Sequence, residues 1–147
     1  MYENAEVREN SEVYRNAIVR GNAEVRGNAI VSENAEVCIN AIVSEGAIVR
    51  GNAIVSENAK VCGNARVHGD AEVCENSIIK SNKDYLVFKN SWSSGRYFTW
   101  TRSNNMWSVG CFYGTGEELI EKAYKDSKLS GDEYKRIVEY VNSINNK

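Results

Sequence analysis

The fold is decided by residues 16–33, which read Asn-Ala-Ile-Val-Arg-Gly, Asn-Ala-Glu-Val-Arg-Gly and Asn-Ala-Ile-Val-Ser-Glu. This six-residue unit, Asn-Ala-x-Val-x-(Gly/Glu), recurs thirteen times without a gap between residues 3 and 80. A fixed period over many units is typical of a repeat architecture, and a six-residue period predicts a parallel β-helix.

Each unit specifies one side of a coil. Side chains alternate along a strand, so Ala17 and Val19 point inward together while Ile18 and Arg20 point outward. The remaining Gly or Glu and the following Asn must turn the corner, and Asn and Gly tolerate the positive φ that tight corners require. Three sides are expected to close a triangular coil, so the repeats make about four coils in a prism ~20 Å long, at ~4.8 Å per coil.

The pattern resembles the hexapeptide-repeat family of left-handed β-helices, in which an aliphatic residue is followed four positions later by a small one. Val7 and Ser11 match this spacing, as do Val13 and Ala17 and every later pair. The resemblance implies a left-handed coil, although the general preference for right-handed crossovers predicts the opposite hand. The expected fold is therefore mainly β, a left-handed parallel β-helix.

Length and charge exclude several classes of protein. The chain has 147 residues, enough for one compact unit or two small ones. A net charge of −2 and a pI near 5.6 provide neither a basic nucleic-acid footprint nor the strongly acidic surface of a DNA mimic. An N-terminal apolar run is absent, so we expect no signal peptide and no membrane span, and a cytoplasmic location.

The four cysteines, Cys38, Cys62, Cys74 and Cys111, lack the spacing of a zinc site. In eighteen-residue coils, Cys38 and Cys74 would share a side at a separation of two coils, ~9.6 Å, which is beyond disulfide reach. We therefore expect free thiols in a reducing cytoplasm.

The outward position before each valine is charged toward both ends of the repeats and aliphatic in the middle. Isolated exposed aliphatic residues are common, but an uninterrupted aliphatic girdle is typical of a buried surface. We predict that the girdle packs in a homo-oligomer, a dimer or a trimer, or under the C-terminal segment. Its residues are Ile30, Ile42, Ile48 and Ile54.

The first repeat begins almost at once, without a capping helix before it. A terminal coil exposes unpaired strand edges, which proteins normally cover. Either this end pairs with another chain, or charges such as Glu6 and Arg8 discourage pairing.

Composition changes after Lys80, because residues 85–113 contain all three Trp and all three Phe. Alternation predicts strands at 85–89, 96–102 and 106–113. Capping boxes at Thr115–Glu118 and Ser130–Glu133 predict two helices. We divide the chain into a β-helix, residues 1–82, and a small α+β (β-β-β-α-α) module, residues 83–147, which we expect to cap the last coil.

Residues 108–115 read Ser-Val-Gly-Cys-Phe-Tyr-Gly-Thr and are followed by Glu117-Glu118-Leu119. This stretch resembles a module that follows hexapeptide repeats in phage and prophage proteins, and the resemblance covers roughly residues 85–145. It implies a viral or mobile-element origin and a host-cytoplasmic setting, and nothing about chemistry.

His68 is the one histidine and the candidate for catalysis. The resemblance to the hexapeptide-repeat family implies an acyltransferase alternative in which a histidine is the general base. The position of His68 is elsewhere filled by Arg, Ser, Cys, Tyr or Lys, which indicates tolerance. The carbonic anhydrases of this fold bind zinc through three histidines, so they are excluded. Cys62 and Cys74 flank His68 in sequence but fall on other sides of the coil, so we predict no catalytic residue, metal or cofactor.

A partner-binding surface is predicted in the aromatic segment, since Trp, Tyr and Arg often dominate interface energies. The two helices can cover only one face of the predicted sheet, which would leave the other face free. The same aromatics could instead form the core of the module or stack on bases. The predicted binding residues are Trp92, Arg96, Trp100, Arg102 and Trp107.

The expected function is a non-enzymatic interaction protein of phage type. It would bind and inhibit a host factor, such as an effector of a bacterial defence system of the CRISPR type. The alternatives are an acyltransferase that uses His68 and a structural adaptor or oligomeric spacer.

Overall fold

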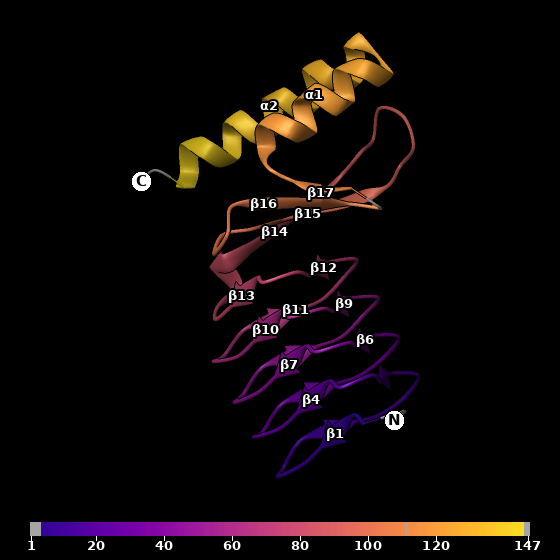
Figure 1. Cartoon of the computed structure of the whole chain (residues 1–147), viewed down its shortest axis with the longest axis vertical. Coiled ribbons are helices and arrows are strands. Elements are labelled where there is room, and N and C mark those ends of the chain that lie inside the picture. The colour runs from indigo at the N-terminus through magenta and orange to yellow at the C-terminus, as the bar shows by residue number, and fades with distance from the viewer. Residues whose placement is uncertain (1–3, 111, 146–147) are drawn as a thin grey trace.

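The computed structural model describes residues 4–110 and 112–145. It is a stack of coils with a sheet across one end and two helices above that sheet (Figure 1). The coils contain thirteen strands of two residues: β1 (Glu6–Val7), β2 (Glu12–Val13), β3 (Ile18–Val19), β4 (Glu24–Val25), β5 (Ile30–Val31), β6 (Glu36–Val37), β7 (Ile42–Val43), β8 (Ile48–Val49), β9 (Ile54–Val55), β10 (Lys60–Val61), β11 (Arg66–Val67), β12 (Glu72–Val73) and β13 (Ile78–Ile79).

Every third strand pairs in parallel, which produces three sheets along the three sides of the coil. Their orders are β1-β4-β7-β10-β13, β2-β5-β8-β11 and β3-β6-β9-β12. The register places Val7 opposite Val25 and Val25 opposite Val43, so one coil takes eighteen residues. The predicted parallel β-helix of about four coils is therefore confirmed.

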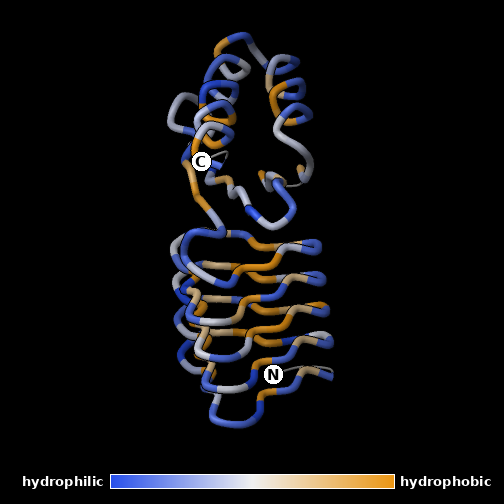
Figure 2. Tube along the Cα trace, turned by 90° about the vertical axis from the view of Figure 1, so that its left-hand side faces the viewer, coloured by the Kyte–Doolittle hydropathy of each residue, from blue (hydrophilic) through white to orange (hydrophobic). Residues whose placement is uncertain are grey.

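The core of the stack is the predicted wall of alanine and valine. All inward side chains from Ala23 to Val73 are completely buried. Figure 2 shows hydrophobic residues along the strands and hydrophilic ones at the corners. Val7 and Val13 are only partly buried, because no described coil lies beyond them.

The corners differ from the sequence expectation in one respect. The residue with positive φ is the one before each Asn position, which is Gly or Glu except at Arg15 and Ile39, and φ ranges from 56° at Glu75 to 71° at Gly51. The Asn side chains instead stack between coils, since Asn4 donates to Asn22 (3.2 Å) and Asn22 donates to Asn40 (3.4 Å). The Asn of the repeat is thus explained by ladders of side-chain hydrogen bonds.

The C-terminal module follows a short 3-10 helix, η1 (Asn82–Asp84). Its antiparallel sheet has the order β14-β15-β16-β17. The predicted third strand is in fact two, because Val109 pairs with Phe112 across a reversal at Gly110, whose φ is +55°. The strands are β14 (Tyr85–Lys89), β15 (Tyr97–Thr101), β16 (Met106–Val109) and β17 (Phe112–Gly114).

Two helices follow, α1 (Gly116–Asp126) and α2 (Lys128–Asn145). The first predicted capping box is confirmed, with Glu118 N donating to Thr115 Oγ1 at 3.2 Å and Thr115 N donating to Glu118 Oε1 at 2.9 Å. The second is wrong, since α2 begins earlier and Ser127 Oγ accepts from Ser130 N at 3.1 Å. Among the described residues, neither helix is long and apolar enough to cross a bilayer.

The sheet lies between the coils and the helices, so both of its faces are covered (Figure 1). One face contributes Phe98, Trp100 and Trp107 to a core shared with α1 and α2. The other face places Thr99 and Thr101 on the last coil, where both are buried. The expectation of one free sheet face is therefore wrong.

Residues of η1, β15 and the turn after β15 also complete the hydrogen bonding of the last coil. Within the stack, the outward residue of each strand donates its N–H to a carbonyl of the next coil, as Lys60 does to Ser77 at 2.9 Å. At the end of the stack, side-chain oxygens replace those carbonyls on all three sides. The bonds run from Arg66 N to Asn82 Oδ1 (2.9 Å), from Glu72 N to Thr99 Oγ1 (3.0 Å) and from Ile78 N to Ser103 Oγ (2.8 Å). The segment that follows the coils therefore caps the last coil, as the sequence predicts.

Replacing Thr99 by Val should lower the free energy of unfolding by ~1–2 kcal/mol. Valine keeps the shape of threonine but leaves the N–H of Glu72 without its acceptor at a buried contact. Urea denaturation measures the change, and Thr99→Ser, which keeps the hydroxyl, is the control. Equal losses in the two variants would contradict a role for the hydroxyl.

Candidate functional site

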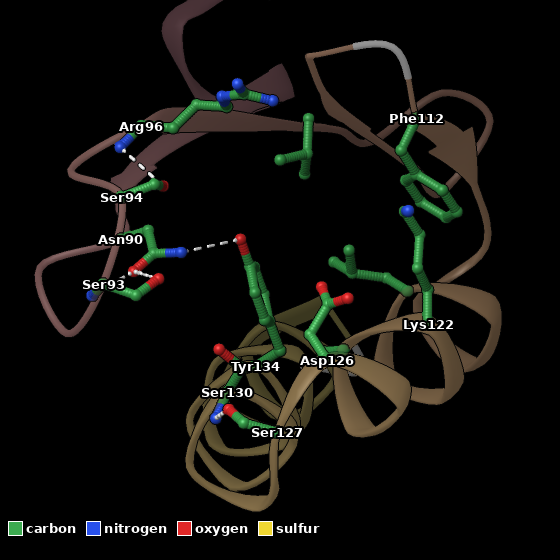
Figure 3. A pocket seen from close by; sticks show the side chains of 13 residues that line it. Asn90, Ser93, Ser94, Arg96, Phe112, Lys122, Asp126, Ser127, Ser130 and Tyr134 are labelled. Carbon is green, nitrogen blue, oxygen red and sulfur yellow. Dashed lines mark hydrogen bonds between the residues drawn. The ribbon is translucent and has the colours of Figure 1, made fainter.

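A pocket of about 530 Å³ lies inside the C-terminal module, between the loop joining β14 to β15 and the helices (Figure 3). Cavities of ~300–1,000 Å³ are typical of ligand sites. Three separate segments converge on it: the loop, the β16–β17 hairpin and the helical pair. The lining residues are Asn90, Ser93, Ser94, Arg96, Val109, Phe112, Leu119, Lys122, Ala123, Asp126, Ser127, Ser130 and Tyr134.

Asn90 holds the loop side of the pocket in place. Its Oδ1 accepts from the backbone N–H of Ser93 at 3.0 Å, and its Nδ2 donates to the hydroxyl of Tyr134 at 3.3 Å. Its backbone N–H donates to the carbonyl of Arg96 at 2.8 Å, which closes the loop. Asn90 is buried, so these hydrogen bonds replace those that its amide would make with water.

Trp92 and Ser130 join the same loop to α2. The indole N–H donates to Ser130 Oγ at 3.1 Å, and the indole packs edge-on against Tyr134 at 5.0 Å between ring centroids. Trp92 is half-buried and uses its polar group inside the module. Trp92 therefore holds the β14–β15 loop against α2.

Charged groups surround an apolar floor. Val109, Phe112 and Leu119 contribute apolar surface, while the exposed Arg96 and Lys122 bring positive charge. The Arg96 guanidinium lies against Gly110, where a Cβ would collide with its Nη1. An apolar floor with positive charge at the rim suits a ligand that has both an apolar and an acidic part.

Two further groups limit what the pocket can do chemically. Asp126 ends α1 and adds one negative charge to the lining. Burial raises the pKa of Tyr134, although the Asn90 hydrogen bond and the charge of Arg96 oppose this shift. The phenol is therefore neutral near pH 7, and it acts as a hydrogen-bonding group in the wall of the pocket.

A second hollow of about 400 Å³ adjoins the first where the loop meets the coils, and Arg96 lines both. Asp70 and Glu72 contribute from the coils. Burial raises the pKa of Glu72, while its hydrogen bond to Ser108 and the charge of Arg96 lower it. Arg96 thus lies between the acidic end of the stack and the pocket of the module.

Of the five predicted partner-binding residues, only Arg96 lines the pocket of about 530 Å³ in the module. Trp100 and Trp107 have exposed fractions of 0% and 1%, so they are core residues and that part of the prediction is wrong. Arg102 lies elsewhere, where Nε donates to the carbonyl of Lys83 at 3.0 Å and Nη1 donates to Asn145 Oδ1 at 3.0 Å. The sequence analysis missed Lys122 and Asp126, whose four-residue spacing on α1 was the available signal.

The aliphatic girdle faces three directions. Ile42, Ile48 and Ile54 belong to three different sheets and are each half-buried, and Ile30 lies beside Ile48 as predicted. A flat partner could cover only one side, and the largest aliphatic pair on one side is Ile30 with Ile48. A girdle-mediated oligomer stays a prediction.

His68 is exposed after β11, on a different side from Cys62 after β10 and Cys74 after β12. The predicted placement of these three residues on different sides of the coil is therefore confirmed. Burial raises the pKa of Cys74 to about 11, so its thiol is protonated at neutral pH. Cys38, Cys62 and Cys74 are free thiols, and Cys111 lies outside the described residues. Within residues 4–110 and 112–145, no group of three His, Cys, Asp or Glu could hold a metal ion.

The fold and the pocket define a parallel β-solenoid protein with a ligand-sized pocket in its capping module. The chain matches no family model, no curated protein and no solved structure.

Proposed function

We propose that this chain is a non-enzymatic interaction protein that binds a segment of another protein in the pocket of its C-terminal module. The observation that carries the proposal is the combination of an apolar floor with exposed Arg96 and Lys122 at the rim. A segment with an apolar side chain beside an acidic one complements this lining. The coils then act as a rigid support that is hydrogen-bonded to the module on two sides, at Thr99 and Ser103.

The partner is a host protein, and the setting is the host cytoplasm. The resemblance of residues 85–145 to phage and prophage modules supports this part of the proposal. A bacterial defence effector, for example of the CRISPR type, is the leading kind of target, and binding would inhibit it. The isolated, exposed position of His68 favours this reading over an acyltransferase.

Charge reversal at the rim should weaken partner binding by ~1–3 kcal/mol. The test immobilises the full chain as wild type, Arg96→Glu, Lys122→Glu and Lys125→Glu, and identifies captured bacterial proteins by mass spectrometry. Lys125 is on the same helix as Lys122 but does not line the pocket, and it pairs with Glu121 at 4.0 Å. It is therefore the matched control.

A protein that the wild type and Lys125→Glu capture, and that both pocket variants lose, supports the proposal. Circular dichroism confirms that each variant is folded. If all four chains capture the same proteins equally, the pocket is not the binding surface and the proposal fails.

A further inference from the structure

Two hydroxyl groups of α2 line the pocket of the C-terminal module, and no described residue accepts their hydrogens. They belong to Ser130 and Tyr134, one helical turn apart, with exposed fractions of only 8% and 7%. The Asn90 amide has a fixed orientation, because its Oδ1 accepts from the N–H and the hydroxyl of Ser93 at 3.0 and 3.3 Å. Its Nδ2 therefore faces Tyr134 and makes the phenol oxygen an acceptor at 3.3 Å.

The Ser130 hydroxyl is an acceptor for a similar reason. The indole N–H of Trp92 can only donate, so Ser130 Oγ accepts from it at 3.1 Å and keeps its own hydrogen. Among residues 4–110 and 112–145, neither hydroxyl donates a hydrogen bond. A buried donor without an acceptor is costly, and burial raises the pKa of Tyr134, which keeps the phenol protonated. The α2 wall therefore offers two hydrogen-bond donors to a ligand in the pocket (Figure 3).

The charges of the lining favour a ligand group with one negative charge. Arg96 and Lys122 are positive and Asp126, one turn after Lys122 on α1, is negative, so the lining has a net formal charge of +1. A carboxylate has one negative charge and two acceptor oxygens. A phosphate monoester would bring about −1.5 to −2 near pH 7. A carboxylate thus suits both the hydroxyl donors and the charge of the lining.

A chain end places a carboxylate closest to an apolar side chain. In an extended internal segment, neighbouring side chains point to opposite faces, so an apolar and an acidic side chain share a face only two residues apart, ~6.6 Å along the strand. In a C-terminal residue, the carboxylate and the side chain branch from one Cα. Both can then enter one pocket that has donors on α2 and an apolar floor of Val109, Phe112 and Leu119. Capture of a terminal carboxylate is a recurring mode of peptide recognition.

We propose that the pocket binds the C-terminal residue of the partner protein, with its carboxylate hydrogen-bonded to Tyr134 and its apolar side chain on the floor. Ser130 provides the second donor of the same wall, and Arg96 and Lys122 provide the opposite charge at the rim. This inference rests on the proposed function and names the part of the partner that enters the pocket.

Nuclear magnetic resonance of the full chain tests the inference with two small probes, N-acetyl-leucine and N-acetyl-leucinamide. They share their side chain and size, and only the first has a carboxylate. The acid should shift the indole N–H signal of Trp92, which is hydrogen-bonded to Ser130, with a dissociation constant on the order of millimolar. The amide should bind at least ~10-fold more weakly, because charge-assisted hydrogen bonds are about twice as strong as neutral ones.

Two tyrosine variants show whether the phenol is the donor. Tyr134→Phe removes the hydroxyl and should weaken binding of the acid about 10-fold. Tyr140→Phe makes the same change on the same helix at a residue that is 57% exposed and does not line the pocket, so binding should be unchanged. Circular dichroism confirms that both variants are folded, and the comparison of acid with amide on the wild type depends on neither of them.

Three results would each overturn the inference: equal binding of acid and amide, no shift at Trp92, or a Tyr134→Phe chain that binds the acid as tightly as Tyr140→Phe. The proposed function is tested separately by capture through Arg96 and Lys122. If that capture is lost in the two charge-reversal variants while acid and amide bind equally, the pocket binds a partner segment that is not a chain end. Only the present inference then fails.

Discussion

Replacing Val49 by Asp is expected to lower the free energy of unfolding by more than ~4 kcal/mol. Val49 lies in β8, is completely buried, and has Val31 and Val67 as its neighbours in the adjacent coils. The wall around it is alanine and valine, which cannot hydrogen-bond a carboxylate. Each coil contacts only its neighbours, so loss of a central coil separates the stack into two short pieces. Urea denaturation followed by circular dichroism measures the loss.

Arg50→Asp is the control, because it introduces the same carboxylate one residue later on the exposed side of the coil. Its cost should be under ~0.5 kcal/mol. Equal denaturation midpoints for Val49→Asp and Arg50→Asp would contradict the inward and outward assignment.

The stack could be predicted from the sequence because strand alternation and the six-residue period are both present in all thirteen repeats. Strand alternation places Ala and Val on one face, and the six-residue period brings like residues into register, as the pairing of Val7 with Val25 shows. The corner residue was less certain, because Asn suits both positive φ and side-chain ladders. Only the structure shows that Glu33 and Ile39 take the left-handed conformation and that the Asn side chains form hydrogen-bonded ladders.

The module was harder to predict because its interactions are distant in sequence. Alternation places Phe98 and Trp100 on one face of β15, but it does not say what covers each face. The structure covers both, with helices on the Trp100 face and the last coil on the Thr99 face. The pocket combines Asn90 and Arg96 from the β14–β15 loop with Lys122 from α1. The sequence contains no repeated pattern that relates these positions to one another.

Trp107→Ala is expected to lower the free energy of unfolding of the C-terminal module by ~3–5 kcal/mol. The indole is buried, with its centroid 6.0 Å from the rings of both Phe88 and Phe98. Its removal leaves a cavity at the centre of the core between the sheet and the helices. Thermal unfolding followed by near-ultraviolet circular dichroism, which reports aromatic packing, measures the change.

The loss should extend into the coils, because β15 and the turn after it provide two of the side-chain acceptors of the last coil, Thr99 and Ser103. Far-ultraviolet circular dichroism should therefore show early melting of part of the strand signal as well. Tyr97→Ala on β15 is the control, since Tyr97 is 42% exposed and its loss should cost under ~1 kcal/mol. If Trp107→Ala melts like the wild type and yet binds a partner more weakly, Trp107 is a contact residue and its assignment to the core is wrong.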